Sequence, residues 1–309
     1  MPLLLALSWG GHLYAWTSPQ VIGMFVTTVV SLGLFALVEL RVTEPLLPLD
    51  LFKNKVFTFA NAAAFMISMA FFGAITFLPL YLQLGLGVSA TNSGMAMLPL
   101  MFGILLSSIT SGRLVTKFGR YKPMMLFGGV ALLVGVFLMT GLGPQTPLLG
   151  VVWRVFILGL GLGPAQGLFA LAVQNAVPRN RIGVVTSSSQ FFRQIGSTVG
   201  VAVFGAVMTH ALATESSRAG GPGLGLNQLQ ALALAQTEHG LGARHVVVDP
   251  ILKIAFSRAI VDLFWVAGGV ALVGLVFIFL IPELPLLGRG HPEPVAEPGE
   301  EFLRESEAV

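Results

Sequence analysis

Residues Ile182 to His210 read IGVVTSSSQFFRQIGSTVGVAVFGAVMTH, an apolar run of membrane-spanning length with a single charged residue, Arg193. An α-helix rises about 1.5 Å per residue, so Arg193 is expected roughly 15 Å beyond the polar start of the run. A charged side chain at that depth costs about 2.5–3.5 kcal/mol on insertion scales. We expect its helix face to contact a partner helix or a water-filled cavity; an arginine that snorkels or caps carbonyls in a packed bundle would also fit. Small and polar residues share that face at helical spacing, namely Thr186, Ser189, Gln190, Gly196, Ser197 and Gly200.

The composition indicates a multi-span membrane protein. Of the 309 residues, 55% are hydrophobic and 10% charged, whereas soluble domains carry about 25% charged residues. The uncharged runs exceed about 20 residues and show no alternation, so the spans are helices and not barrel strands. The chain has no cysteine, which excludes disulfides, thiolate metal sites and cysteine nucleophiles.

The predicted fold class is an all-α integral membrane protein with seven full transmembrane helices plus an N-terminal half-helix. Residues 1–55 comprise a partial helix over 1–8, a full span over 20–38 and a connector. Residues 56–281 form a six-helix bundle, and residues 282–309 form a disordered acidic tail that holds seven glutamates and two arginines. The six spans of the bundle are predicted at 56–84, 91–111, 124–142, 148–177, 182–210 and 259–281.

The basic residues predict how the spans are oriented. Simple alternation of the spans places the basic loops at 39–55, 112–123 and 178–181 on one side of the membrane. By the positive-inside rule this side is cytoplasmic, and the C-terminus shares it. We therefore expect a multi-pass protein of the cell (plasma or inner) membrane, in which the positive charge reports topology and not nucleic-acid binding.

The most basic short loop, Gly112-Arg-Leu-Val-Thr-Lys-Phe-Gly119-Arg120-Tyr-Lys122-Pro, resembles motif A of the major facilitator superfamily. That motif has the pattern G-x-x-x-D-x-x-G-R-[KR] and joins the second and third helices of each six-helix half. The resemblance implies a cytoplasmic gating loop formed by Gly112, Gly119, Arg120 and Lys122. Thr116 stands where the motif has aspartate, which puts a charge-relay role in doubt. An ordinary basic inner loop is the alternative.

Two further stretches extend the resemblance. They are Gly159-Leu-Gly161-Leu-Gly163-Pro-Ala-Gln166-Gly167 and Phe192-Arg193-Gln194-Ile-Gly196-Ser-Thr-Val-Gly200. In their order and spacing they resemble the last helices of the fourteen-span drug:proton antiporters, the EmrB/QacA-like family. The opening WGGHLYAWTSP and the connector EPLLPLDLFKNKVF resemble that family's extra helix pair and the link between its halves. The resemblance implies that this chain is a C-terminal portion, without the first six-helix half.

Glycines and polar residues indicate which helix faces would pack together and which would line a cavity. Small residues every four positions let helices pack closely and slide, although static packing explains any one of them equally well. These glycines are Gly159, Gly163, Gly167, Gly196 and Gly200. Polar groups at membrane depth commonly serve as interhelical hydrogen-bond partners. Our candidates for the lining of a substrate cavity are Asn61, Phe65, Gln166, Gln190 and Arg193.

Carboxylates are missing from the middle of every predicted span between residues 56 and 281. Proton coupling needs a group that can be buried, protonated and released, and the resemblance places such acids in the first half of the family. We expect one half of a proton-coupled efflux antiporter for hydrophobic or cationic small molecules, working by alternating access. It would need a separate N-terminal half or a second copy. The alternative is a truncated, non-transporting assembly or regulatory subunit. The sequence has no metal or cofactor motif and no clustered acids or nucleophile–base pair that would favour an enzyme.

Overall fold

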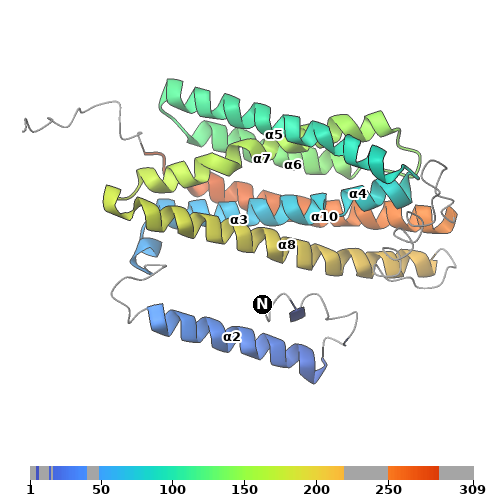
Figure 1. Ribbon diagram of the computed structural model, residues 1–309, viewed down its shortest axis with the longest axis horizontal. Coiled ribbons are helices and arrows are strands. Elements are labelled where there is room, and N and C mark those ends of the chain that lie inside the picture. The colour runs from blue at the N-terminus through green and yellow to red at the C-terminus, as the bar shows by residue number, and fades with distance from the viewer. Residues whose placement is uncertain (1–4, 7–13, 15–16, 40–48, 219–249, 285–309) are drawn as a thin grey trace, which may run out of the picture.

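The computed structural model describes residues 5–6, 14, 17–39, 49–218 and 250–284, and every element of regular structure in the figure is helical apart from one isolated bridge residue (Figure 1). Six helical segments in this part are long and apolar enough to cross a membrane. They are Lys55–Gly85, Ala90–Phe118, Lys122–Met139, Leu148–Asn175, Arg179–Glu215 and Lys253–Leu280.

The elements follow one another in a simple order. A short 3₁₀ turn, η1 (Leu49–Lys53), leads into α3 (Lys55–Ile75), α4 (Leu78–Leu80) and the π-helical segment η2 (Tyr81–Gly85). Next come α5 (Ala90–Phe118), α6 (Lys122–Met139) and α7 (Leu148–Asn175). The turn η3 (Arg179–Arg181) precedes α8 (Ile182–Arg218), and α10 (Pro250–Leu280) closes the bundle.

The helix directions follow from the close contacts at glycines. A Cβ atom on Gly196 or Gly200 of α8 would meet the backbone of Phe65 or Met69 of α3, so these helices run parallel. A Cβ on Gly159 or Gly163 of α7 would likewise meet α5 at Leu100 and Ser107, which makes α5 and α7 parallel. Helix α6 runs antiparallel to α7, because Gly128 meets Pro164 and Gly135 meets Leu158. Helix α10 runs antiparallel to α3, because Gly274 meets Ile67 and Phe277 stacks on Phe59. Consecutive membrane helices therefore alternate in direction.

One end of the bundle collects the basic residues of the short turns, and we call it the basic end. Asn54 caps α3 by accepting a hydrogen bond from the Val56 N–H at 2.9 Å, and its Nδ2 donates to the Ala176 carbonyl at the end of α7 (2.9 Å). Arg181 forms an ion pair with Asp50 of η1. The start of α3, the end of α7 and the start of α8 are thereby held together.

Three helices are longer than the predicted spans. Helix α5 continues from the predicted end at 111 to Phe118, α8 from 210 to Arg218, and α10 starts at Pro250 instead of 259. Hydropathy detects only the apolar part of a helix, whereas the hydrogen-bonded backbone continues into polar sequence until a residue such as Gly119, with φ 74°, ends it.

The N-terminal part is described only in pieces. Helix α2 (Pro19–Glu39) forms over the predicted 20–38 segment, and Figure 1 shows it apart from the bundle. It is not among the six candidate spans, so seven full spans plus a half-helix stays a prediction. Of the predicted partial helix over 1–8 only residues 5 and 6 are described; the predicted tail beyond residue 284 lies outside the described residues.

Candidate functional site

Arg193 projects from α8 to α7. Its Nη1 donates to the main-chain carbonyl of Gln166 at 3.1 Å and also to the Gln166 side-chain oxygen Oε1. Within the described part of the chain, Arg193 has no carboxylate partner. The half-buried guanidinium thus donates through Nη1 to neutral oxygen atoms, within a helix of membrane-spanning length. A cation held only by neutral acceptors keeps its full charge toward whatever faces it.

The local sequence determines which face of α7 carries Gln166. Pro164 has no N–H, so the interruption in the hydrogen-bond ladder of α7 falls at the Leu160 carbonyl and not at Gln166. Gly161 and Pro164 are buried and pack against Gly128 of α6, whereas Gln166 and Gly167 are exposed. The turn of α7 that carries Gln166 therefore has one face in the bundle and the other toward Arg193.

The remaining cavity candidates lie on α3 and α8 in different environments. Asn61 of α3 is 3% exposed, and neither its Nδ2 nor its Oδ1 has a hydrogen-bond partner in the described part. Phe65 lies one turn further along α3, where its backbone crosses Gly196. Gln190 is exposed one turn before Arg193 on α8. The structure thus brings Gln166 to Arg193 and Phe65 to the helix that carries Arg193, while Asn61 faces the packed interior.

The predicted gating loop is only partly a loop. Gly112 lies inside α5, where the Thr116 hydroxyl donates back to its carbonyl at 2.9 Å. Gly119 ends the helix in the left-handed conformation, and Arg120 is exposed. Lys122 donates from Nζ to the Phe279 carbonyl of α10 at 2.9 Å, and its charge therefore caps the C-terminal end of that helix.

The five glycines predicted to mediate packing fall into two groups. A Cβ atom on Gly159, Gly163, Gly196 or Gly200 would come within about 3 Å of a neighbouring helix backbone, which requires the residue to be glycine. A Cβ on Gly167 would have nothing within 4 Å. Four of these positions therefore set helix–helix distances, and Gly167 lies on the open face beside Gln166.

Some connections were not identified from the sequence. Gln174 donates to the Thr186 hydroxyl at 2.8 Å and links α7 to α8 between Arg193 and the basic end. At the other end of the bundle Glu215 is buried and pairs with Arg258 of α10 at 3.3 Å. Our predicted span ends at residue 210, so it does not include Glu215. One feature of the sequence indicated a helix here: Glu215 and Arg218 are three residues apart, the spacing of an ion pair on one helix face.

The described residues contain no group of three or more His, Cys, Asp or Glu side chains that could hold a metal ion. The arrangement consists of amide, guanidinium and aromatic groups on parallel and antiparallel helices of membrane-spanning length. A polytopic helical bundle with polar groups at membrane depth is the architecture typical of membrane transport proteins.

Comparison with known proteins agrees with this class. The family model described as Major Facilitator Superfamily matches residues 2–201, and the chain belongs to that superfamily. It is similar to the multidrug transporter protein MdtP of Bacillus subtilis, at 45% identity over 206 residues, covering 67% of this chain and 38% of that protein. An MFS-type transporter of Mycobacterium tuberculosis is 34% identical over 312 residues, covering 97% of this chain and 44% of that protein.

A tetracycline resistance determinant of Streptomyces rimosus is also similar, at 34% identity over 209 residues, covering 67% of this chain and 60% of that protein. The chain thus spans roughly 40–60% of the length of these relatives. It is a multi-pass membrane protein of a transporter family that includes multidrug efflux proteins, a family of transporters and not of enzymes.

Proposed function

We propose that this chain is the C-terminal portion of a proton-coupled efflux antiporter of the fourteen-span EmrB/QacA-like type, working by alternating access in the cell membrane. The proposal draws on relatives named for multidrug and tetracycline resistance, whose length this chain covers only in part. The substrate would be a hydrophobic or cationic small molecule, with Gln166, Gln190 and Phe65 supplying hydrogen bonds and aromatic surface.

The charge of Arg193 at membrane depth, with no carboxylate beside it among the described residues, carries the proposal. Its bond to the Gln166 carbonyl is also the contact expected of an arginine that caps carbonyls in a packed bundle. Arg193 is about 16 Å along α8 from Ile182, where an unneeded charge would be costly. Its charge has only neutral acceptors within the described bundle. In our proposal it faces the cavity between two halves, where it serves as the counter-charge for carboxylates of the other half. It does not bind a cationic substrate directly.

Proton coupling requires acidic side chains near the level of Arg193. In the described spans the acidic residues are Glu215, paired with Arg258 toward the end opposite the basic end, and Asp262, one turn from Arg258 on α10. Neither is near the level of Arg193. The proton-carrying acids are therefore proposed to lie in a separate N-terminal half or, less economically, in a second copy of the chain.

Reconstitution tests the proposal. The chain is placed in liposomes alone or after co-expression with the N-terminal half of the Bacillus subtilis relative, and efflux of a fluorescent cationic dye is followed under a pH gradient. We expect proton-driven efflux only from the combination. Arg193→Ala should reduce it about tenfold or more, because charge-assisted hydrogen bonds contribute about 1.5–3 kcal/mol.

The matched control is Arg113→Ala, which removes an exposed arginine of α5 at the basic end. This variant should retain efflux within about twofold, since an exposed charge contributes little. Proton-coupled efflux by the chain alone would contradict the need for a partner half. An Arg193→Ala variant as active as the control would remove the basis for placing Arg193 in the cavity.

A further inference from the structure

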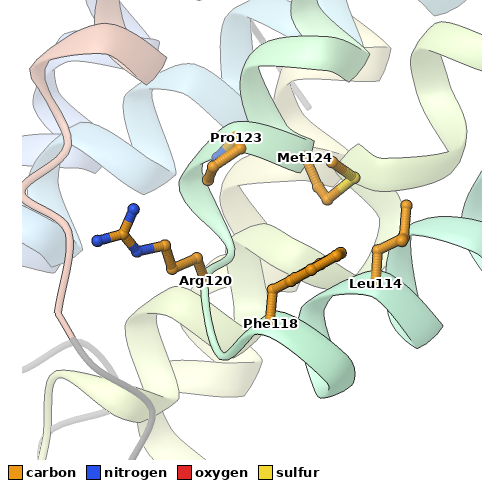
Figure 2. Close-up of a pocket in the computed structure, with 5 residues that line it drawn as sticks. All are labelled: Leu114, Phe118, Arg120, Pro123 and Met124. Carbon is orange, nitrogen blue, oxygen red and sulfur yellow. The ribbon is translucent and has the colours of Figure 1, made fainter.

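A pocket lies at the basic end, where α5 ends and α6 begins. It has a volume of about 330 Å³ and is lined by Leu114, Phe118, Arg120, Pro123 and Met124 (Figure 2). Four of these residues are apolar. Figure 2 shows that Arg120 extends away from the other four side chains, so the pocket has an apolar part and a cationic rim.

Other basic residues besides Arg120 lie at this rim. Arg113 and Lys117 are exposed on the last turns of α5, and Arg120 forms no ion pair with any residue of the described part. Lys122 donates to the Phe279 carbonyl at the end of α10, so its charge lies there and not at the rim. An occupant that matches this surface therefore combines negative charge with one or two apolar side chains.

The chain that follows α10 starts at the turn between α5 and α6, where Tyr121 follows Arg120. The Leu284 N–H donates to the hydroxyl oxygen of Tyr121 at 3.0 Å, and that hydroxyl donates to the Pro282 carbonyl at 3.2 Å. Tyr121 is fully buried and adjacent to Arg120 in sequence. Burial raises the pKa of the Tyr121 hydroxyl above its usual value of 10.0, so the hydroxyl stays protonated and able to donate at neutral pH.

We propose that residues 300–303 of the C-terminal segment, Glu300-Glu301-Phe302-Leu303, occupy this pocket. The adjacent glutamates match Arg120 and the basic residues of α5, and Phe302 and Leu303 match the apolar lining. Residues 285–309 contain six glutamates and two arginines, so the segment as a whole is attracted to the rim.

The tether between Leu284 and Glu300 is long enough for this contact. Sixteen residues can extend to roughly 55 Å, and they start from Leu284, which is hydrogen-bonded to Tyr121 in the turn between α5 and α6. Tethering raises the effective concentration of the segment to the order of millimolar, so weak pairwise contacts suffice for occupancy.

Disulfide trapping tests the proposal in the full chain, which has no cysteine of its own. Leu114→Cys is combined with Leu303→Cys in nanodiscs of zwitterionic lipid, and the rate of disulfide formation is measured by intact mass. The comparison pair is Lys53→Cys with Leu303→Cys, because Lys53 is an exposed residue of η1 at the same end. We expect the pocket pair to close about tenfold faster than the comparison pair.

Matched charge variants identify the contact. Glu300→Gln with Glu301→Gln should slow the pocket pair about two- to fivefold, whereas Glu305→Gln with Glu307→Gln removes the same charge and should change it less. Equal rates for the two cysteine pairs, or equal effects of the two glutamine variants, would overturn the proposal. Covalent dimers would assign the pocket to a second copy, and loss of trapping in phosphatidylglycerol nanodiscs would assign it to anionic lipid; either result overturns it as well.

Discussion

At the scale of single residues, Arg193 shows what a sequence can and cannot predict about a membrane site. A lone charge inside an apolar run is visible without a structure, and Gln166 was named independently as a polar group at membrane depth. Their hydrogen bond joins residues 27 positions apart on two helices. No periodicity within one helix encodes such a pair, because it depends on how α7 and α8 are rotated against each other.

Asn61 is a residue whose environment the sequence did not predict. The sequence marks it only as the most polar residue of its span, which suits a cavity wall. The structure buries it to 3% exposure among the helices that surround α3. Buried amides without partners destabilise a fold by about 1–3 kcal/mol, so its retention in the bundle is not explained by packing alone.

Gly196 allows a direct test of helix packing at the residue level. We expect Gly196→Ala to destabilise the bundle by about 1–3 kcal/mol, because the added methyl would come within 2.9 Å of the Phe65 Cα and force α3 and α8 apart. Thermal unfolding in detergent measures the effect. Gly167→Ala is the matched control on α7 and should be neutral or slightly stabilising, since nothing lies within 4 Å of its Cβ position. Equal behaviour of the two variants would argue against the close crossing.

At the scale of elements, the ion pair between Asp50 of η1 and Arg181 predicts a pH dependence. The hydrogen bond from Arg181 lowers the pKa of the Asp50 carboxyl below its usual value of 3.8. A lowered pKa means that the stabilisation is fully present above about pH 4 and is lost as the pH falls through the lowered pKa. Because both side chains are about half exposed, we expect Asp50→Asn to cost only about 0.2–1 kcal/mol at pH 7.

The measurement is the difference in unfolding free energy between the wild type and Asp50→Asn, taken at pH 7 and again near pH 2. The difference should disappear at the lower pH, where the wild-type carboxyl is also protonated. Arg181→Gln in the Asp50→Asn background should add little, because the partner has already been lost. A difference that persists undiminished at low pH would show that Asp50 acts through something other than its charge.

The elements themselves were largely predictable, and their ends were not. Long apolar runs identify the six membrane helices, because the bilayer enforces both length and hydrophobicity. Helix ends depend on caps and on contacts between elements. Asn54 was predictable as a cap because it precedes an apolar run, but its second hydrogen bond, to Ala176, depends on the tertiary fold. Likewise the first half of the basic motif around Gly112 is helical, and α5 ends only at Gly119, which adopts the left-handed conformation.

At the scale of the whole molecule, alternation of the helices predicts the topology in the membrane. The ends of α5 and α7 and the starts of α3, α6 and α8 meet at the basic end, together with the end of α10. The turn between α6 and α7 at the opposite end, residues 140–147, carries no lysine or arginine. Charge asymmetry between short loops orients membrane proteins, so the basic end and the C-terminal segment are predicted to face the cytoplasm.

The absence of cysteine makes this topology testable with single substitutions. Gln145→Cys, exposed in the turn between α6 and α7, should react with a membrane-impermeant maleimide in intact cells. Lys53→Cys, exposed at the basic end, should react only after the membrane is permeabilised. The reverse labelling pattern would mean that the bundle has the opposite orientation in the membrane. Its basic turns would then violate the positive-inside rule.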